Sequence, residues 1–290
     1  MSHFFYSIII PAFNAAKTLE KCLHSVLSQD FHSYEIIVVN DGSKDNTLSL
    51  LQSWQENHSD IKLQIINQEN SGLGAARNAA LQLAKGEYCA LLDADDYWHP
   101  EKLKSCHSFL KHSPECDVLY HNVINIGLNG EKKRRVFALS AASEILEKGC
   151  PIVPSAAILK TTTAQAFGFS TQSKFHGAED LYLWLELFAA KKCFYYWPEA
   201  IAYYRETGGM SSRIDEHLKK VENVYEYFYQ LDLYKRLAFE QALQRKWYEA
   251  ARFYQKRGQH HAAERYYSMA DGKSLKIFTL KIMNRLGLSY

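Results

Sequence analysis

Short runs of β-branched and other apolar residues alternate with helical patterns through the first hundred residues of this sequence. The runs lie at 7–10, 35–39, 63–66 and 88–92, and the second of them is continuously apolar. A continuous apolar run is typical of a strand covered on both faces, and repeated strand-helix units build a parallel sheet. The sequence therefore predicts an α/β fold in which helices flank a central sheet.

The pattern becomes mixed after Pro100. Strand-like runs at 118–124, 156–159 and 194–197 surround a helical segment at 179–190. Their order departs from simple strand-helix repeats, so we expect a mixed sheet here. We interpret this stretch as the second half of one domain.

The sequence changes character again from about Asp215, where it becomes helical and rich in Tyr, Lys and Arg, with a helix-turn-helix pattern around Gly258. The charge changes as well: residues 213–290 carry 15 Lys and Arg against 9 Asp and Glu, whereas the whole chain has 34 against 32. We therefore predict a helical C-terminal region with a role of its own. The predicted regions are 1–212, with halves 1–98 and 99–212, and 213–290.

Size and composition exclude several classes of protein. The chain has 290 residues, 47% of them hydrophobic, which is enough to bury a sizeable core. A net charge of +2 is too balanced for a nucleic-acid binder held by a uniform positive field. The apolar run at 4–10 is far shorter than the roughly 20 residues that span a bilayer, and it lacks the features of a signal peptide. Because the six cysteines form no CxxC pair, we expect reduced thiols and a cytoplasmic protein.

The C-terminal segment 273–290 contains four basic residues and no acidic one. Helical spacing places Leu275, Ile282, Met283 and Leu286 on one face. Two interpretations remain open: a helix docked on the protein core, or a surface anchor that makes peripheral contact with the inner face of a membrane.

Polar residues follow each of the first four predicted strands. The segments are 11–14, 40–47, 70–74 and 93–96. A single polar segment of this kind could equally be an ordinary turn. The carboxyl ends of parallel strands, however, meet at one edge of a sheet, and ligands bind at that edge. Four consecutive polar ends therefore predict a ligand site at this edge.

The last of these segments holds three carboxylates, Asp93, Asp95 and Asp96, directly after an apolar strand. Their mutual repulsion favours a bound cation, and hard oxygen ligands select Mg²⁺ or Mn²⁺. Such ions usually bind through one or two carboxylates together with substrate phosphates. The segment 71–78 begins a helix and carries Arg77, which favours an anion nearby. Together these features suit a diphosphate leaving group.

In their order and spacing, these motifs resemble those of family 2 glycosyltransferases, which have the GT-A fold. The resemblance covers residues 4 to about 212, and it implies a Rossmann-like nucleotide-binding mixed sheet flanked by helices, followed here by a C-terminal helical extension. The motifs that carry it are PAFN at 11–14, IVVNDGS at 37–43, GLGAARN at 72–78, LLDADD at 91–96, and Gly168-Phe169 followed by EDLYLW at 179–184.

The resemblance implies a role for individual residues. Asp41 would accept a hydrogen bond from the nucleotide base, Asp93 would hold the ribose or sugar, and Asp95 would bind the Mn²⁺ or Mg²⁺ ion. The implied donor-binding residues are Pro11, Asn14, Asp41, Arg77 and Asp93. The loop after Tyr204-Arg205 departs from the family pattern at Thr207 and Gly209, so contacts from that loop to the diphosphate are not implied.

Asp180 would be the catalytic base, with Glu179 adjacent to it. Two other interpretations remain open: Glu179 is the base, or Asp180 is an acid at a helix N-terminus that the helix dipole stabilises. The twelve histidines give no metal-binding spacing.

The activity predicted in this way is that of an inverting, metal-dependent glycosyltransferase. It moves a sugar from a nucleotide-diphosphate sugar, most simply a UDP-sugar, to a hydroxyl of a saccharide or lipid-linked saccharide, in the synthesis of cell-surface polysaccharide or glycolipid. A nucleotidyltransferase is the nearest alternative, but the segment after the first strand lacks the glycine- and basic-rich phosphate loop expected of one. The other alternative is a non-catalytic protein that binds a nucleotide-sugar or mediates assembly.

Overall fold

The computed structural model describes residues 4–127, 130–134, 136–205, 214–231, 236–270 and 275–287. The chain divides into two compact units, Met1–Ser140 with Pro151–Gly209, and Ala141–Cys150 with Met210–Tyr290. The expected boundary between residues 212 and 213 lies outside the described residues. The second unit also takes in Ala141–Cys150, a segment expected in the first region.

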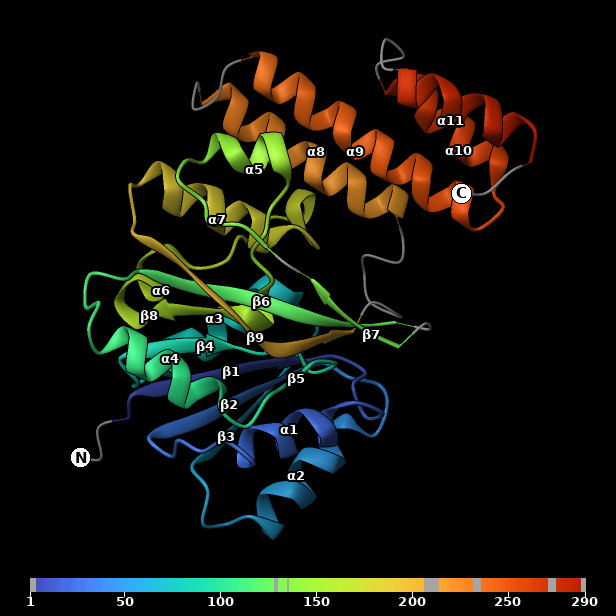
Figure 1. The fold of residues 1–290 in the computed structure, drawn as a ribbon. Helices are drawn as coiled ribbons and strands as arrows, with labels where there is room; N and C mark the ends of the chain where they lie inside the picture. The colour runs from blue at the N-terminus through green and yellow to red at the C-terminus, as the bar shows by residue number, and fades with distance from the viewer. Residues whose placement is uncertain are drawn as a thin grey trace. The chain divides into compact units, whose positions relative to one another are not determined.

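Within the described residues, the strands form one sheet of nine in the first unit (Figure 1). The strand order is β3-β2-β1-β4-β8-β6-β9-β5, with β7 paired to β6. The strands are β1 (Tyr6–Ala12), β2 (Tyr34–Asp41), β3 (Leu63–Gln68), β4 (Tyr88–Leu91), β5 (Tyr97–Trp98), β6 (Val118–Gly127), β7 (Gly130–Arg134), β8 (Ala157–Lys160) and β9 (Phe194–Arg205).

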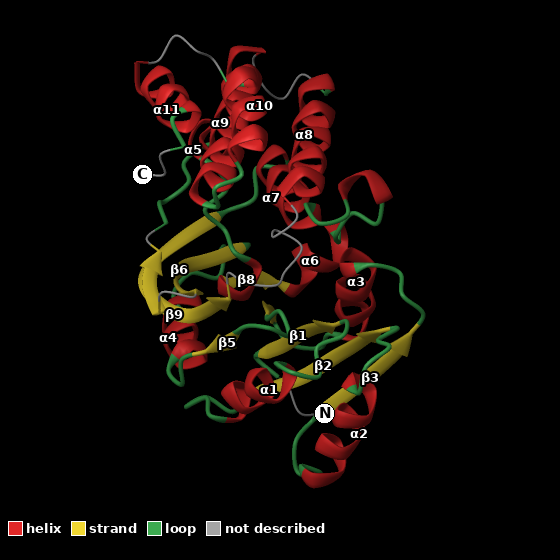
Figure 2. Cartoon of the chain, turned by 90° about the vertical axis from the view of Figure 1, so that its right-hand side faces the viewer, coloured by secondary structure: helices red, strands yellow, loops and turns green. Residues whose placement is uncertain are grey.

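The first four strands are parallel, as predicted, and β8 pairs antiparallel with both β4 and β6. Helices cover both faces: α1 and α2 lie on one side of the β1-β2-β3 end, and α3 lies on the other (Figure 2). This is the mixed, helix-flanked sheet expected from the sequence. The helices of the first unit are α1 (Leu19–Leu27), α2 (Thr47–Asn57), α3 (Leu73–Leu83), α4 (Lys102–Leu110), α6 (Thr161–Phe167) and α7 (Glu179–Ala189).

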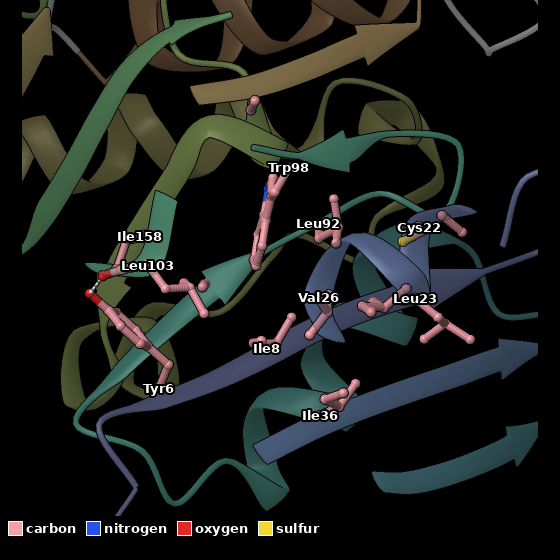
Figure 3. Close-up of a cluster of buried hydrophobic side chains, with 14 of the residues drawn as sticks. Tyr6, Ile8, Cys22, Leu23, Val26, Ile36, Leu92, Trp98, Leu103 and Ile158 are labelled. Carbon is pink, nitrogen blue, oxygen red and sulfur yellow. Dashed lines mark hydrogen bonds between the residues drawn. The ribbon is translucent and has the colours of Figure 1, made fainter. Parts of the chain in front are cut away.

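The core between the sheet and α1 is apolar and closed to solvent (Figure 3). Ile8 and Ile36 from the central strands meet Leu23 and Val26 of α1, all fully buried. At the rim of this cluster, the Tyr6 hydroxyl donates a hydrogen bond to the Leu103 carbonyl (3.2 Å). Packing of this kind fixes the strands, and with them the loops at their carboxyl ends.

The second unit is helical. Its helices are α5 (Ser143–Lys148), α8 (Ile214–Gln230), α9 (Arg236–Lys256), α10 (His260–Met269) and α11 (Leu275–Arg285). The predicted turn at Gly258, which has a φ of 71°, joins α9 to α10. The α5 segment belongs to this unit because it packs on α9, where Arg245 donates to the Ile145 carbonyl (3.3 Å).

Small and aromatic residues make the core of the helical unit, including Ala251, Ala263 and Tyr267. The α11 helix packs on this core through Leu280, Ile277 and Met283. None of the described helices is long and apolar enough to cross a membrane.

Candidate active site

The loops that follow β1 and β2 are joined by hydrogen bonds. The Asn14 amide N–H donates to Ser43 Oγ (2.9 Å), and the Asn14 side-chain oxygen accepts from the Lys44 N–H (2.8 Å). Asn14 has a φ of 50°, a left-handed conformation that asparagine tolerates better than most residues. Pro11 is buried in β1 beside Val39 of β2. Asn14 therefore belongs to an ordered pair of loops, and Pro11 lies at the end of the strand that leads into them.

Asp41, at the end of β2, is hydrogen-bonded to the loop between β3 and α3. One carboxylate oxygen accepts the Ser71 N–H and the Gln68 side-chain amide (both 2.8 Å), and the other accepts the Gly72 N–H (2.9 Å). Gly72 has a φ of 90°, and a Cβ there would lie 2.8 Å from the His176 ring, so only glycine fits. The GLGAARN segment thus begins where the Asp41 carboxylate holds it.

Arg77 of α3 is a buried charged residue of the site, since its side chain is only 1% exposed. Its Nη2 lies 2.6 Å from Asp93 Oδ1, its Nη1 lies 3.5 Å from Glu179 Oε1, and its guanidinium lies 5.0 Å from the centre of the Phe169 ring. Burial acts to lower the Arg77 pKa, but the charges of Asp93, Glu179 and Asp180 outweigh burial and raise it. A single cation therefore joins the end of β4 to the start of α7.

The two acids at the start of α7 have different surroundings. Glu179 is buried, faces Arg77 and accepts the Gly177 N–H through Oε2 (2.6 Å). Burial raises the Glu179 pKa, although Arg77 acts against that shift. Asp180 is half-buried, and its Oδ1 accepts the Leu181 N–H (2.8 Å). Glu179 is committed to internal contacts, whereas Asp180 stands nearer to solvent.

The three predicted carboxylates have different partners. Asp96 is buried and accepts hydrogen bonds from the Ser155 hydroxyl (2.5 Å) and the Arg205 N–H (2.8 Å). Burial and the charges of Asp93 and Asp95 raise the Asp96 pKa well above its ordinary value. Asp93 pairs with Arg77, but the charges of Asp93 and Asp95 still act on Asp96, so part of the repulsion expected among the three carboxylates persists.

Asp95 is the member of the trio best suited to an exogenous cation. Burial, and then the charge of Asp93, raise its pKa to about 6. The part of the chain that the structure describes contains no group of three His, Cys, Asp or Glu side chains able to hold a metal ion together. One carboxylate completed by substrate phosphate oxygens is nevertheless a usual arrangement for Mg²⁺, so the residues present fit such an ion.

Sequence analysis missed several positioning contacts. The Asn78 side-chain amide pairs in both directions with the Phe169 backbone, with distances of 2.8 and 2.7 Å. Ser155 and Arg205 fix the acidic loop: Ser155 Oγ also accepts the Asp93 N–H (3.1 Å), and the Arg205 Nε donates to the Asp95 carbonyl (3.1 Å). The Tyr204-Arg205 pair was the available signal for one of these contacts. The doubtful positions after it, 207 and 209, lie outside the described residues.

The mixed sheet, with helices on both faces, has the GT-A fold. Residues 7–162 match the model of the family described as "Glycosyl transferase family 2". The chain belongs to this family.

Curated relatives agree with this assignment. The chain is 33% identical over 187 residues to the Escherichia coli enzyme named UDP-Glc:alpha-D-GlcNAc-diphosphoundecaprenol beta-1,3-glucosyltransferase WfgD. The aligned region covers 64% of this chain and 71% of that protein. The chain is also 39% identical over 100 residues to chondroitin synthase of Escherichia coli, where the match spans 34% of this chain but only 14% of the synthase. The shared part is therefore a small fraction of that larger protein.

Solved structures show the same fold. *S. aureus* TarS 1–349 in complex with UDP has a TM-score of 0.63 and 20% identity, with 97% of this chain and 87% of that chain covered. The mannosyltransferase PcManGT from *Pyrobaculum calidifontis*, in complex with GDP-Man and Mn²⁺, has a TM-score of 0.62 and 19% identity, with 98% and 80% covered.

Proposed function

We propose that this glycosyltransferase inverts the anomeric centre, depends on Mn²⁺ or Mg²⁺, and uses a UDP-sugar as donor. The observation that carries the proposal is the buried Arg77, which pairs with Asp93 at the strand end and with Glu179 beside Asp180. In this arrangement the carboxylate assigned to the donor and the helix that carries the base share one cation. Their spacing is therefore set by the protein before any substrate binds.

The donor is bound at the carboxyl ends of β1, β2 and β4. Pro11 and Asn14 line the nucleotide pocket, Asp41 accepts a hydrogen bond from the base, and Asp93 contacts the ribose or sugar. The loop contacts fill Asp41 Oδ1 but leave Oδ2 with a single hydrogen bond, so Oδ2 can accept one more. WfgD is named for UDP-Glc, and TarS was solved with UDP, which together support uracil as the base.

Asp95 holds the divalent cation. When bound, the ion supplies positive charge against the diphosphate that leaves the sugar. PcManGT was solved with Mn²⁺, which supports a divalent ion in a protein of this fold.

Asp180 is the catalytic base. Its carboxylate accepts the proton of the acceptor hydroxyl as that oxygen attacks the anomeric carbon, and the bond from that carbon to the diphosphate oxygen breaks. A single displacement of this kind inverts the anomeric centre. Glu179 is the weaker candidate because its carboxylate is buried against Arg77 and the Gly177 N–H.

The acceptor in this proposal is a saccharide carried on a lipid diphosphate, at the cytoplasmic face of a membrane. WfgD is named for an acceptor linked to diphosphoundecaprenol, and another relative is a putative teichuronic acid biosynthesis glycosyltransferase of *Bacillus subtilis*. The proposed process is therefore the synthesis of cell-surface polysaccharide or glycolipid.

A donor screen tests the proposal without knowledge of the acceptor. The purified chain is incubated with UDP-, GDP- and dTDP-sugars, with Mn²⁺, with Mg²⁺ and with EDTA, and the released products are separated. Metal-dependent release of UDP is expected. Release of pyrophosphate in a parallel incubation with a nucleoside triphosphate and a sugar phosphate would instead indicate a nucleotidyltransferase. Donor binding without any release, even with saccharide acceptors added, would indicate a binding protein.

A further inference from the structure

The outer side of α11 combines exposed apolar and basic side chains. Ile282 and Leu286, one helical turn apart, are 44% and 69% exposed. Lys281 and Arg285 stand next to them in sequence, and the helix contains no acidic residue. Two large apolar side chains at the surface of one turn have a hydration cost that a partner surface would relieve.

The inner side of the same helix is already occupied. Leu280 and Met283 pack on the core of the helical unit, and the buried Asn284 side chain donates to the His260 carbonyl (2.9 Å). Met283 is therefore half-buried against the unit, whereas Ile282 and Leu286, which the sequence groups with it, are exposed. The helix is docked on its unit and still presents a second apolar side to solvent.

Charge indicates which partner fits this side. The segment 273–290 holds four basic residues and no acid. In the described part of α10, Glu264 is the acid that approaches α11, and it pairs with Arg285 (2.7 Å). Lys281 makes no ion pair with another described side chain, and it is half-buried next to the exposed Ile282. Apolar side chains flanked by positive charge match an anionic lipid surface.

We propose that the outer side of α11, formed by Lys281, Ile282, Arg285 and Leu286, docks on an anionic membrane surface. The apolar pair enters the region between headgroups and acyl chains, while the basic side chains contact lipid phosphates. The biological role of this docking rests on the proposed function, because docking would bring the enzyme to a lipid-linked acceptor. Binding of the helix to the membrane does not depend on that function.

Vesicle sedimentation of the full chain tests the docking surface. Vesicles of phosphatidylcholine alone are compared with vesicles containing 30% phosphatidylglycerol, for the wild type and for the double variant Ile282→Glu with Leu286→Glu. The wild type is expected to sediment with the anionic vesicles, less so at high salt, and the double variant to lose at least about tenfold in partition coefficient. The matched control is Leu231→Glu, which changes another exposed leucine of the helical unit and should sediment like the wild type.

Two further readouts separate the possible failures. Circular dichroism and metal-dependent UDP release are measured on the same variants, so that a misfolded variant or a wrong function is recognised independently of lipid binding. Equal sedimentation of wild type and double variant would overturn the proposal, as would a wild type that ignores anionic vesicles. Concentration-dependent self-association that the double variant abolishes, without any vesicle binding, would show instead that this side joins two copies of the chain.

Discussion

The two units of this protein use their charged residues in opposite ways. In the sheet unit, Arg77 and Glu179 are buried and pair across more than a hundred residues of sequence. In the helical unit, pairs such as Arg236 with Glu240 lie one helical turn apart and are exposed. Burying a charge costs free energy unless the charge is paired and hydrogen-bonded. A buried ion pair between distant residues therefore indicates a structural or functional role, which an exposed pair does not. The contrast favours the first unit as the place of the proposed chemistry and the second as the place of the proposed docking surface.

The largest effect is expected for the residue assigned to the cation. Asp95→Asn should abolish metal-dependent donor binding while the fold persists, because the amide keeps the shape but removes the charge. Isothermal titration of UDP with and without Mn²⁺ measures this. Asp60→Asn, at an exposed position, is the control and should leave binding intact. Undiminished Mn²⁺-dependent binding in the Asp95 variant would remove that residue from the metal site.

Removing the buried cation should destabilise the sheet unit strongly. Arg77→Leu leaves Asp93 and Glu179 without their partner, and breaking a buried ion pair typically costs about 3–5 kcal/mol. Urea unfolding at pH 7 measures the loss in the free energy of unfolding. A loss below about 1 kcal/mol would mean that the pair is not a structural bridge.

Lys102 is a buried charged residue of the sheet unit that lies outside the site, so it can be compared with the paired Arg77. Its ammonium lies 3.7 Å from the centre of the Trp98 ring, and in the described part of the chain it has no hydrogen-bond partner. Burial lowers its pKa from 10.5 to about 8. Between about pH 8 and 10.5 the unfolded chain therefore binds more protons, and this residue's destabilising contribution fades as the pH rises.

Replacing Lys102 should therefore raise stability. Lys102→Met removes the cost of burying the charge but also the contact with the Trp98 ring, so the net gain at pH 7 should be about 1–3 kcal/mol. The gain should shrink from pH 8 to pH 10.5. A variant less stable than the wild type, with an unchanged pH slope, would show that the ammonium has a partner that stabilises it.

The smallest effect is expected for the exposed pair of the helical unit. The Arg236 and Glu240 side chains are 79% and 47% exposed, and surface pairs of this kind contribute about 0.2–1 kcal/mol. Arg236→Leu should therefore change the free energy of unfolding by less than about 0.5 kcal/mol. This variant is the matched control for Arg77→Leu, and equal losses in the two would end the contrast between the units.

The sequence predicted the local features of the fold well. The continuous apolar run at 35–39 became a central strand, and the polar residues after β1, β2 and β4 gathered at one edge because parallel strands end together. These features depend on periodicity and chain direction, which are readable from neighbouring residues.

Long-range pairing was not predictable in the same way. Nothing near Arg77 in the sequence indicates that Glu179 faces it, and nothing near Asp96 indicates Ser155 as its partner. The packing of α5 on α9 was not predictable either. The α5 segment is short, and in the sequence it lies between two segments of the sheet unit. Contacts of this kind depend on packing between segments far apart in the chain.

In the proposed mechanism Asp180, and not the buried Glu179, takes the acceptor proton. The most direct measurement compares Asp180→Asn with Glu179→Gln, using one acceptor and a donor titration for each variant. Asp180→Asn is expected to keep donor and metal affinity but to lose about 10²–10⁴-fold in transfer rate, the usual contribution of a general base. Near-normal transfer by Asp180→Asn would contradict it, and if Glu179→Gln were then inactive with intact donor binding, the base would be Glu179.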